Sequence, residues 1–183
     1  MSEEVLLRHC APTLAGIKTG NMFTVRFENR EQLLDSLRGL NRRFAGKGLR
    51  VVPLRIGCGS ALVYLYRPKK LAADLEQAPA RRILEENGYA PACPEQCVGC
   101  LRRRMACGAA FPHEVGLFLG YPPEDVSGFI ENDAKNAKCV GAWKVYGDED
   151  QAKRTFAKYK KCTDVYLTLW AQGRSIDRLT VSG

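Results

Sequence analysis

Two strand-like segments separated by a four-residue link constrain the fold of this chain most. Residues 50–56 (RVVPLRI) and 61–66 (ALVYLY) are rich in β-branched and aromatic side chains, and the Gly-Cys-Gly-Ser link between them predicts a hairpin. The two strands of a hairpin run antiparallel, so at least part of the sheet is antiparallel. Pro53 has no backbone N–H to donate, which places residues 50–56 at an edge of the sheet.

Two further segments have the pattern of strands. Residues 22–27 (MFTVRF) alternate apolar and polar side chains, and residues 141–146 (GAWKVY) are a fourth candidate. We expect Asn29 to cap a helix over residues 30–44, and this crossover allows one parallel neighbour in the sheet. The sequence therefore predicts an α/β or α+β fold, with a small mixed sheet of about four strands, including a hairpin, covered by several helices.

Helical patterns account for most of the remaining chain. Helices are expected over residues 3–9, 68–87 (interrupted near Pro79), 123–130, 148–161 and 164–172. A length of 183 residues suits one domain. We expect a single domain over 1–183, in which residues 89–110 form a Cys-rich insertion of loop and helix.

The composition is that of a soluble globule, with 45% hydrophobic and 26% charged residues. No apolar run approaches the roughly 20 residues that span a bilayer, and the start MSEEVLLRHC lacks the features of a signal peptide. We therefore expect a cytoplasmic protein, not associated with membranes, whose eight cysteines are reduced. The net charge of +8 is spread along the chain, which argues against nucleic acid as a partner.

Half of the cysteines lie in one short segment, CPEQCVGCLRRRMAC. They are Cys93, Cys97, Cys100 and Cys107. The C-x3-C-x2-C spacing of the first three favours thiolate ligation of zinc or an iron–sulfur cluster. On a straight helix all four would share one face, but the first and last would stand about 21 Å apart, too far for one metal ion. A metal site therefore requires a loop through Pro94 and Gly99, with a helix that begins near Leu101.

Other interpretations of these cysteines stay open. They could be core side chains on a helix face, or redox-active thiols. Arg104 falls on the same face of an ideal helix, where a cation would lower the pKa of the thiols. A further ligand could be recruited from Cys58, Cys139, Cys162 or His113.

A second set of candidates is spread over the chain. His9, Cys10, Cys139 and Cys162 form an alternative sulfur site. Cys10 is also a candidate nucleophile, with a base supplied by the fold, because its neighbour His9 points to a different helix face. His113 is expected to form hydrogen bonds at a helix start. Four aromatic residues are assigned to the core, namely Trp143, Tyr146, Phe156 and Tyr159. Three lysines are assigned to a solvated helix end, namely Lys158, Lys160 and Lys161.

Several stretches resemble a bacterial domain family of unknown function found mainly in clostridia and related anaerobes. They are HCAPTLAGIKTGN, ALVYLYRP, FPHEVGLFLGYPPEDVSGFIEN, and CVGAWKVYGDEDQAKRTFAKYKKCT with GRSIDRL after it. The matching positions include His9, Cys10, Lys18, Phe111, Pro112, His113, Gly120, Tyr121, Cys139, Trp143, Lys144, Tyr146 and Cys162. Residues 93–107 depart from the family, whose pattern there is an ordinary amphipathic helix.

The resemblance implies no reaction and no catalytic residues. It implies a cytoplasmic protein of anaerobes, in some cases encoded near genes for ferrous-iron uptake and flavodoxin, so a flavodoxin is the expected redox partner. Three functional hypotheses follow. The favoured one is a metal or iron–sulfur protein with a redox or iron-handling role. The alternatives are a regulatory or nucleic-acid-binding module stabilised by zinc, and a cysteine-dependent enzyme that uses Cys10.

Overall fold

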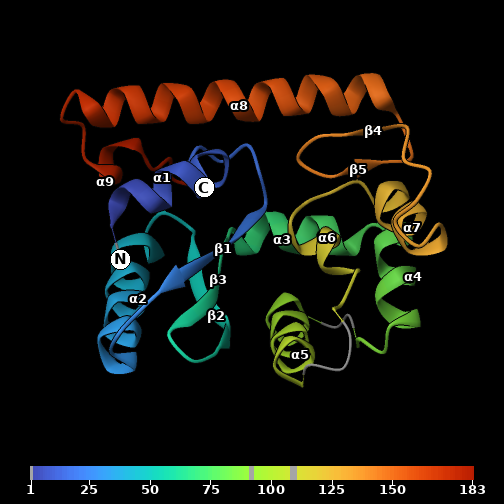
Figure 1. Cartoon of the computed structure of the whole chain (residues 1–183), viewed down its shortest axis with the longest axis horizontal. Helices are drawn as coiled ribbons and strands as arrows, with labels where there is room; N and C mark the ends of the chain where they lie inside the picture. The colour runs from blue at the N-terminus through green and yellow to red at the C-terminus, as the bar shows by residue number, and fades with distance from the viewer. Residues whose placement is uncertain (1, 91–92, 108–110) are drawn as a thin grey trace.

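The computed structural model describes residues 2–90, 93–107 and 111–183 and has an α+β fold (Figure 1). Its main sheet has three strands in the order β1-β3-β2, namely β1 (Gly20–Arg26), β2 (Arg50–Ile56) and β3 (Ser60–Tyr66). Both pairings are antiparallel. Helix α2 (Arg30–Ala45) connects β1 to β2, and β3 inserts between these two strands. The α+β alternative is confirmed, whereas the parallel neighbour that the crossover allowed does not form.

The predicted hairpin is confirmed and occupies the expected place in the sheet. In the turn, Gly57 N donates to Ser60 O at 2.8 Å, and Gly59 has a φ of 75°, a left-handed conformation that favours glycine. β2 lies at an edge, and its register shifts between Pro53 and Arg55. The edge position follows because a proline cannot donate to a second neighbouring strand.

Side chains that alternate along β3 build two cores, one on each face of the sheet. Ala61, Val63 and Leu65 pack into the first core with α1 (Glu3–Leu14), α2 and α9 (Ile176–Leu179). Tyr64 and Tyr66 face the second core. That core includes residues of α3 (Pro68–Glu76), α4 (Ala78–Glu86), α5 (Pro94–Cys107), α6 (Val115–Phe118) and α7 (Pro123–Glu131). A central strand buried on both faces explains the nearly continuous apolar run ALVYLY.

The helix boundaries follow local chemistry in most places. Asn29 Oδ1 accepts hydrogen bonds from the backbone N–H groups of Glu31 and Gln32 and caps α2, as predicted. The expected interruption near Pro79 is confirmed, because α3 ends before Gln77 and Pro79 lies in the first turn of α4. A proline is tolerated there since the first N–H groups of a helix have no partner within it.

The predicted strand over 141–146 is confirmed only at Lys144–Val145, because the chain reverses over residues 141–143. It forms a small ribbon of two short strands, β4 (Cys139–Val140) and β5 (Lys144–Val145). A Cβ on Gly141 would lie 2.2 Å from the ring of Phe156, so only glycine allows this approach.

Helix α8 (Glu149–Ala171) replaces the two helices predicted over 148–161 and 164–172. Asp148 caps it by accepting from Gln151 N at 2.9 Å, and its sequence contains no Gly or Pro to stop it. The helix lies across the molecule, over the β4–β5 ribbon at one end and over α1 and α9 at the other (Figure 1). Within the described residues, no helix has the length and apolar character that a membrane span requires.

Candidate functional site

The cysteine-rich segment forms a continuous helix. α5 runs from Pro94 to Cys107, so the loop expected before Leu101 is wrong. At 1.5 Å per residue, Cys93 and Cys107 lie about 21 Å apart along the axis. Parts of the predicted 89–110 insertion, residues 91–92 and 108–110, lie outside the described chain.

The thiols of α5 have unequal environments. Cys97 is 2% exposed, Cys93 and Cys100 are half-buried, and Cys107 is exposed. Burial, reinforced by repulsion from Cys93 and Cys100, raises the pKa of Cys97. A raised pKa keeps the thiol protonated at neutral pH, which disfavours nucleophilic attack. Cys97 behaves here as a small apolar side chain of the second core.

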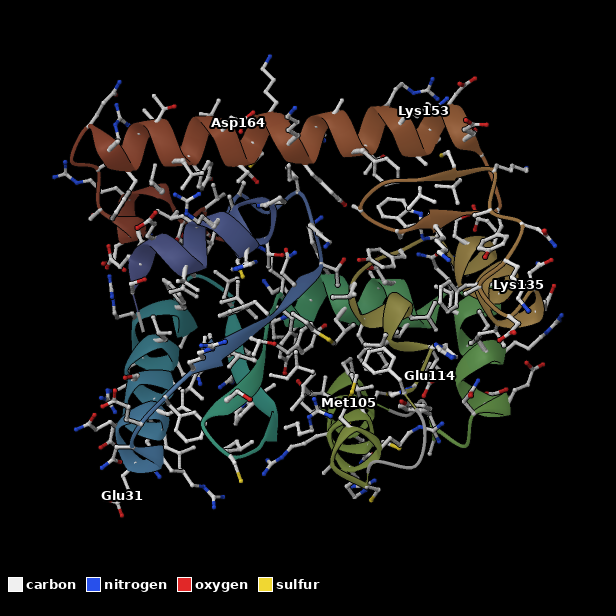
Figure 2. The ribbon with its side chains drawn as sticks, viewed as in Figure 1. Glu31, Met105, Glu114, Lys135, Lys153 and Asp164 are labelled. Carbon is white, nitrogen blue, oxygen red and sulfur yellow. The ribbon has the colours of Figure 1, made fainter. Side chains whose placement is uncertain are left out.

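Arg104, the cation expected to lower the pKa of these thiols, pairs with Glu114 instead. Arg104 Nε lies 2.9 Å from Glu114 Oε1, and Tyr89 Oη donates to the same oxygen at 2.8 Å. Figure 2 shows Glu114 close to the part of α5 that carries Met105. Arg104 thus compensates a carboxylate that is 2% exposed. Among the residues that the structure describes, no three Cys, His, Asp or Glu side chains are grouped to hold a metal ion, so α5 as folded does not fit a metal centre or cluster.

The alternative sulfur set is also dispersed. Cys10 is fully buried in the first core, and burial raises its pKa, so its thiol is protonated and out of reach of a substrate. Cys139 lies near Lys153 of α8. Cys162 is nine positions further along the same helix, about 14 Å from Lys153. His9 is exposed. The structure therefore does not bring these four residues together.

A cleft of about 370 Å³ lies where α1, the β4–β5 loop and α8 meet. We call it the Lys18 cleft. Its lining includes His9, Lys18, Asn21, Phe156, Tyr159 and Lys160. In the described part of the chain no acidic side chain lines this cleft, so its walls are neutral or basic.

Lys18 is a buried cation without an anionic partner. Its side chain is 6% exposed, and Nζ lies 5.3 Å and 5.6 Å from the ring centroids of Tyr121 and Tyr159. Within residues 2–90, 93–107 and 111–183, Nζ has no hydrogen-bond acceptor and no carboxylate in ion-pair distance. Burial lowers the pKa of Lys18 to about 8, with Cys10 acting in the opposite direction. The ammonium therefore predominates at pH 7, although it is largely desolvated.

The end of α1 fixes the backbone of Lys18. Gly16 has a φ of 75°, and its N–H donates to Thr13 O at 3.1 Å, while Ile17 N donates to Pro12 O at 3.0 Å. These two bonds form a Schellman motif, which ends a helix with a left-handed residue. Lys18 N also donates to Pro12 O, at 3.1 Å. The lysine follows a rigid helix stop.

Arg67 anchors the same helix end through hydrogen bonds from its guanidinium. Its side chain is 4% exposed, and Nε donates to Thr13 O at 2.7 Å. Nη2 donates to Leu14 O at 2.8 Å and to Val181 O at 2.7 Å. Thr13 O also accepts from Gly16 N and Leu14 O from Val181 N, so the guanidinium supplies a second donor to each of these carbonyl groups.

Phe156 and Tyr159 line the Lys18 cleft, and Tyr121 and Trp143 pack beside them. Tyr121 Oη donates to Ala142 O at 3.1 Å, and its ring stacks on Trp143 at 4.8 Å between centroids. Trp143 meets Phe156 of α8 edge-on at 4.5 Å. Burial raises the pKa of Tyr121 and of Tyr159 to about 12, so both hydroxyls are neutral and supply no negative charge to Lys18.

Sequence reasoning missed this cleft. It assigned Phe156 and Tyr159 to the core and Lys160 to a solvated helix end, and it gave Lys18 no role. The available signal was the position of Lys18 directly after a helix stop in HCAPTLAGIKTGN, one of the stretches on which the family resemblance rests. His113, predicted to form hydrogen bonds at a helix start, precedes α6 and lies between the rings of Phe111 and Phe129.

No curated protein and no solved structure matches this chain significantly. The family resemblance inferred from the sequence is confirmed at the level of a domain of unknown function. A family model with the description "Protein of unknown function (DUF3793)" matches residues 6–180, and the chain therefore belongs to that family.

Proposed function

We propose that this domain binds a small organic anion, with a carboxylate or phosphate group, in the Lys18 cleft. The observation that carries the proposal is the ammonium of Lys18, on a residue that is 6% exposed, which lies near two neutral aromatic rings and has no anionic partner in the described chain. A desolvated cation is costly, by several kcal/mol, unless it is paired. Two cation–π contacts offset only about 1–2 kcal/mol each.

The remainder of the cleft supports the same ligand class. Lys160 and His9 add positive or neutral polar groups, and Asn21 and Thr163 offer further hydrogen-bonding groups. An anion seated between these groups would supply the acceptors that Lys18 Nζ lacks. A volume of about 370 Å³ suits a compound of metabolite size.

Calorimetric titration with four probes tests the proposal: succinate, pyruvate, inorganic phosphate and glycerol 3-phosphate, all at constant ionic strength. We expect at least one probe to bind the wild type, and Lys18→Met to abolish that binding. Lys160→Met should weaken it several-fold, because Lys160 lines the cleft. Lys161→Met is the matched control on the same helix and should bind like the wild type.

The pH dependence gives a second, independent readout. Succinate and pyruvate stay fully ionised between pH 6.5 and 10, so their affinity should fall above pH 8 as Lys18 loses its proton. The other titratable groups near the site are Cys10, Asp74, Tyr121 and Tyr159, each with a raised pKa, together with exposed His9 and Lys160. Absence of binding by all four probes, or undiminished binding by Lys18→Met, would refute the proposal.

The thiolate hypothesis stays a prediction. A zinc ion or an iron–sulfur cluster on Cys93, Cys97 and Cys100 would require α5 to unwind from its first turns, and the zinc-stabilised alternative meets the same requirement. This prediction is tested by metal and sulfide analysis of protein prepared without oxygen. Circular dichroism would detect the loss of helix that metal binding requires. A flavodoxin partner and a cytoplasmic location are likewise predictions.

A further inference from the structure

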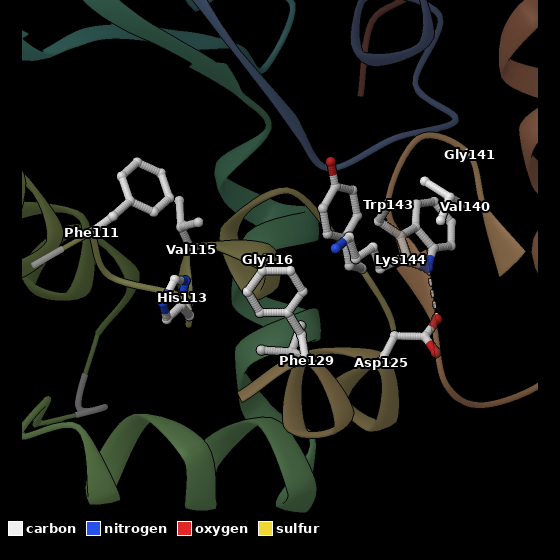
Figure 3. Close-up of a pocket in the computed structure, with 12 residues that line it drawn as sticks. Phe111, His113, Val115, Gly116, Asp125, Phe129, Val140, Gly141, Trp143 and Lys144 are labelled. Atoms are coloured by element: carbon white, nitrogen blue, oxygen red, sulfur yellow. Dashed lines mark hydrogen bonds between the residues drawn. The ribbon is translucent and has the colours of Figure 1, made fainter. Parts of the chain in front are cut away.

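A second cavity is also lined by residues of the β4–β5 ribbon and differs in character from the Lys18 cleft. It has a volume of about 260 Å³, and we call it the aromatic pocket. Its lining includes Phe111, His113, Tyr121, Phe129, Trp143 and Lys144. Figure 3 shows His113, Phe129 and Lys144 turned toward the space between Phe111 and Trp143.

The wall formed by Trp143 is fixed by a buried carboxylate. Asp125, which is 3% exposed, accepts from Trp143 Nε1 at 2.6 Å (dashed in Figure 3) and from Tyr146 N and Gly147 N at 2.7 Å each. Three charge-assisted hydrogen bonds leave Asp125 little capacity for a ligand. The carboxylate therefore orients the indole and does not serve as a counter-charge inside the pocket.

The opposite wall consists of rings that are not packed face to face. The His113 ring lies 6.2 Å from Phe111 and 5.1 Å from Phe129, with interplanar angles of 55° and 54°. Phe111 is 58% exposed, and Val140, which also lines the pocket, is 71% exposed. Exposed apolar side chains at the mouth of a preformed aromatic cavity indicate a ligand that covers them.

The charge in this pocket comes from Lys144. Its Nζ donates to Ala134 O at 2.7 Å and lies 5.9 Å from the centroid of Phe129. An ammonium has three N–H donors, so two remain for another acceptor. The pocket thus combines flat apolar walls with one cation whose nearest carboxylate in the lining, Asp125, is already engaged.

We propose that the aromatic pocket binds a planar aromatic carboxylate of one or two fused rings, with its ring against Phe129 and Trp143 and its carboxylate on Lys144. The volume is below the roughly 300–1,000 Å³ of sites for drug-sized ligands, which limits the ring system. Lys18 does not line this pocket, although Tyr121, whose ring centroid lies 5.3 Å from Lys18 Nζ, does.

Nuclear magnetic resonance of the two indole N–H groups tests the proposal. The chain has two tryptophans, and Trp170→Phe assigns the two signals. Titration with 2-naphthoate should shift the Trp143 signal saturably and leave that of Trp170 unchanged. The neutral analogue 2-naphthalenemethanol should bind about tenfold more weakly, equivalent to about 1.4 kcal/mol.

Variants separate the charge from the apolar walls. Lys144→Met should remove the higher affinity for 2-naphthoate than for 2-naphthalenemethanol, and Lys144→Arg should retain it. Lys135 is an exposed lysine outside the pocket, so Lys135→Met should behave like the wild type. Lys18→Met should also bind 2-naphthoate normally, which distinguishes this site from the anion cleft. Equal shifts of both indole signals, no saturable shift, or an unchanged preference in a folded Lys144→Met variant would overturn the proposal.

Discussion

The α5 cysteines and the Lys18 cleft differ in how their residues are brought together. The cysteines are close in sequence, but a straight helix spreads them along its axis and gives each thiol a different exposure. The groups around Lys18 come from the loop after α1, from Tyr121 and from α8, and the fold places them around one nitrogen atom. A high local density of reactive residues is therefore weaker evidence of a site than convergence of distant segments.

The largest expected effect concerns Arg67, which anchors the helix end before Lys18. Arg67→Met removes three charge-assisted hydrogen bonds, to the carbonyl groups of Thr13, Leu14 and Val181, and should lower the free energy of unfolding by about 3–5 kcal/mol. Urea denaturation measures this change. Arg38→Met, which removes an exposed ion pair with Asp35, is the control and should change stability by less than about 0.5 kcal/mol. Equal effects of the two variants would contradict the anchoring role.

The second test concerns how the charge of Lys18 changes the free energy of unfolding with pH. The folded protein releases the Lys18 proton near pH 8, whereas the unfolded chain holds it up to pH 10.5. The unfolded state therefore binds more protons in this window, and Lys18 should make stability rise with pH there, by up to about 1.4 kcal/mol per pH unit. Below pH 8 the buried charge is a penalty, so Lys18→Met should be more stable than the wild type by about 1–3 kcal/mol at pH 7.

Denaturation of both proteins from pH 6 to pH 10 checks this expectation. The variant should show a flatter profile between pH 8 and pH 10, with its advantage shrinking as pH rises. A variant that is less stable than the wild type at pH 7 would show that Lys18 is a structural residue whose charge is well compensated.

The third test asks whether α5 uses its cysteines as core side chains. Cys97→Ser places a hydroxyl in the second core and should cost about 1–3 kcal/mol, while Cys97→Ala should cost about 1 kcal/mol. Cys107→Ser, on the exposed part of the same helix, should change stability by less than about 0.5 kcal/mol. Thermal unfolding measures all three. If the wild type held metal and the Cys97 and Cys107 variants lost it, the core interpretation would be wrong.

The last test, with the smallest expected effect, compares how fast the cysteines of the folded protein react with a thiol reagent. Exposed Cys58 and Cys107 should react first with an alkylating reagent at pH 8, and Cys10 should react last because it is fully buried and its pKa is raised. Mass spectrometry of timed samples orders the cysteines. Early labelling of Cys10 would revive the nucleophile hypothesis.

The elements that sequence reasoning predicted correctly depend on local chemistry. The hairpin follows from its glycine-rich link, the position of β2 from Pro53, and the starts of α2 and α8 from the capping side chains of Asn29 and Asp148. Each of these features is decided by residues a few positions apart, and the sequence displays them directly.

The errors arose where tertiary contacts decide. α5 begins at Pro94 despite a pattern that allowed a loop, because Cys97, Leu101 and Met105 pack into the second core. The ribbon turns at Gly141 because Phe156 leaves no space for a side chain. The burial of Lys18 depends on Tyr121 and Tyr159, which lie more than a hundred positions further along the chain, so no local pattern could show it.

Helix α8 forms one wall of the Lys18 cleft although it is weakly embedded. Ala152 is the one fully buried residue among its 23, and the remainder of its inner face is half-buried. Segments with little buried apolar surface open locally at low free energy, well below that of global unfolding. Amide hydrogens in the middle of α8 should therefore exchange with deuterium sooner than those of α1, and a bound ligand should slow that exchange at Tyr159. Local opening of α8 would then change the shape of the cleft, without movement of the sheet.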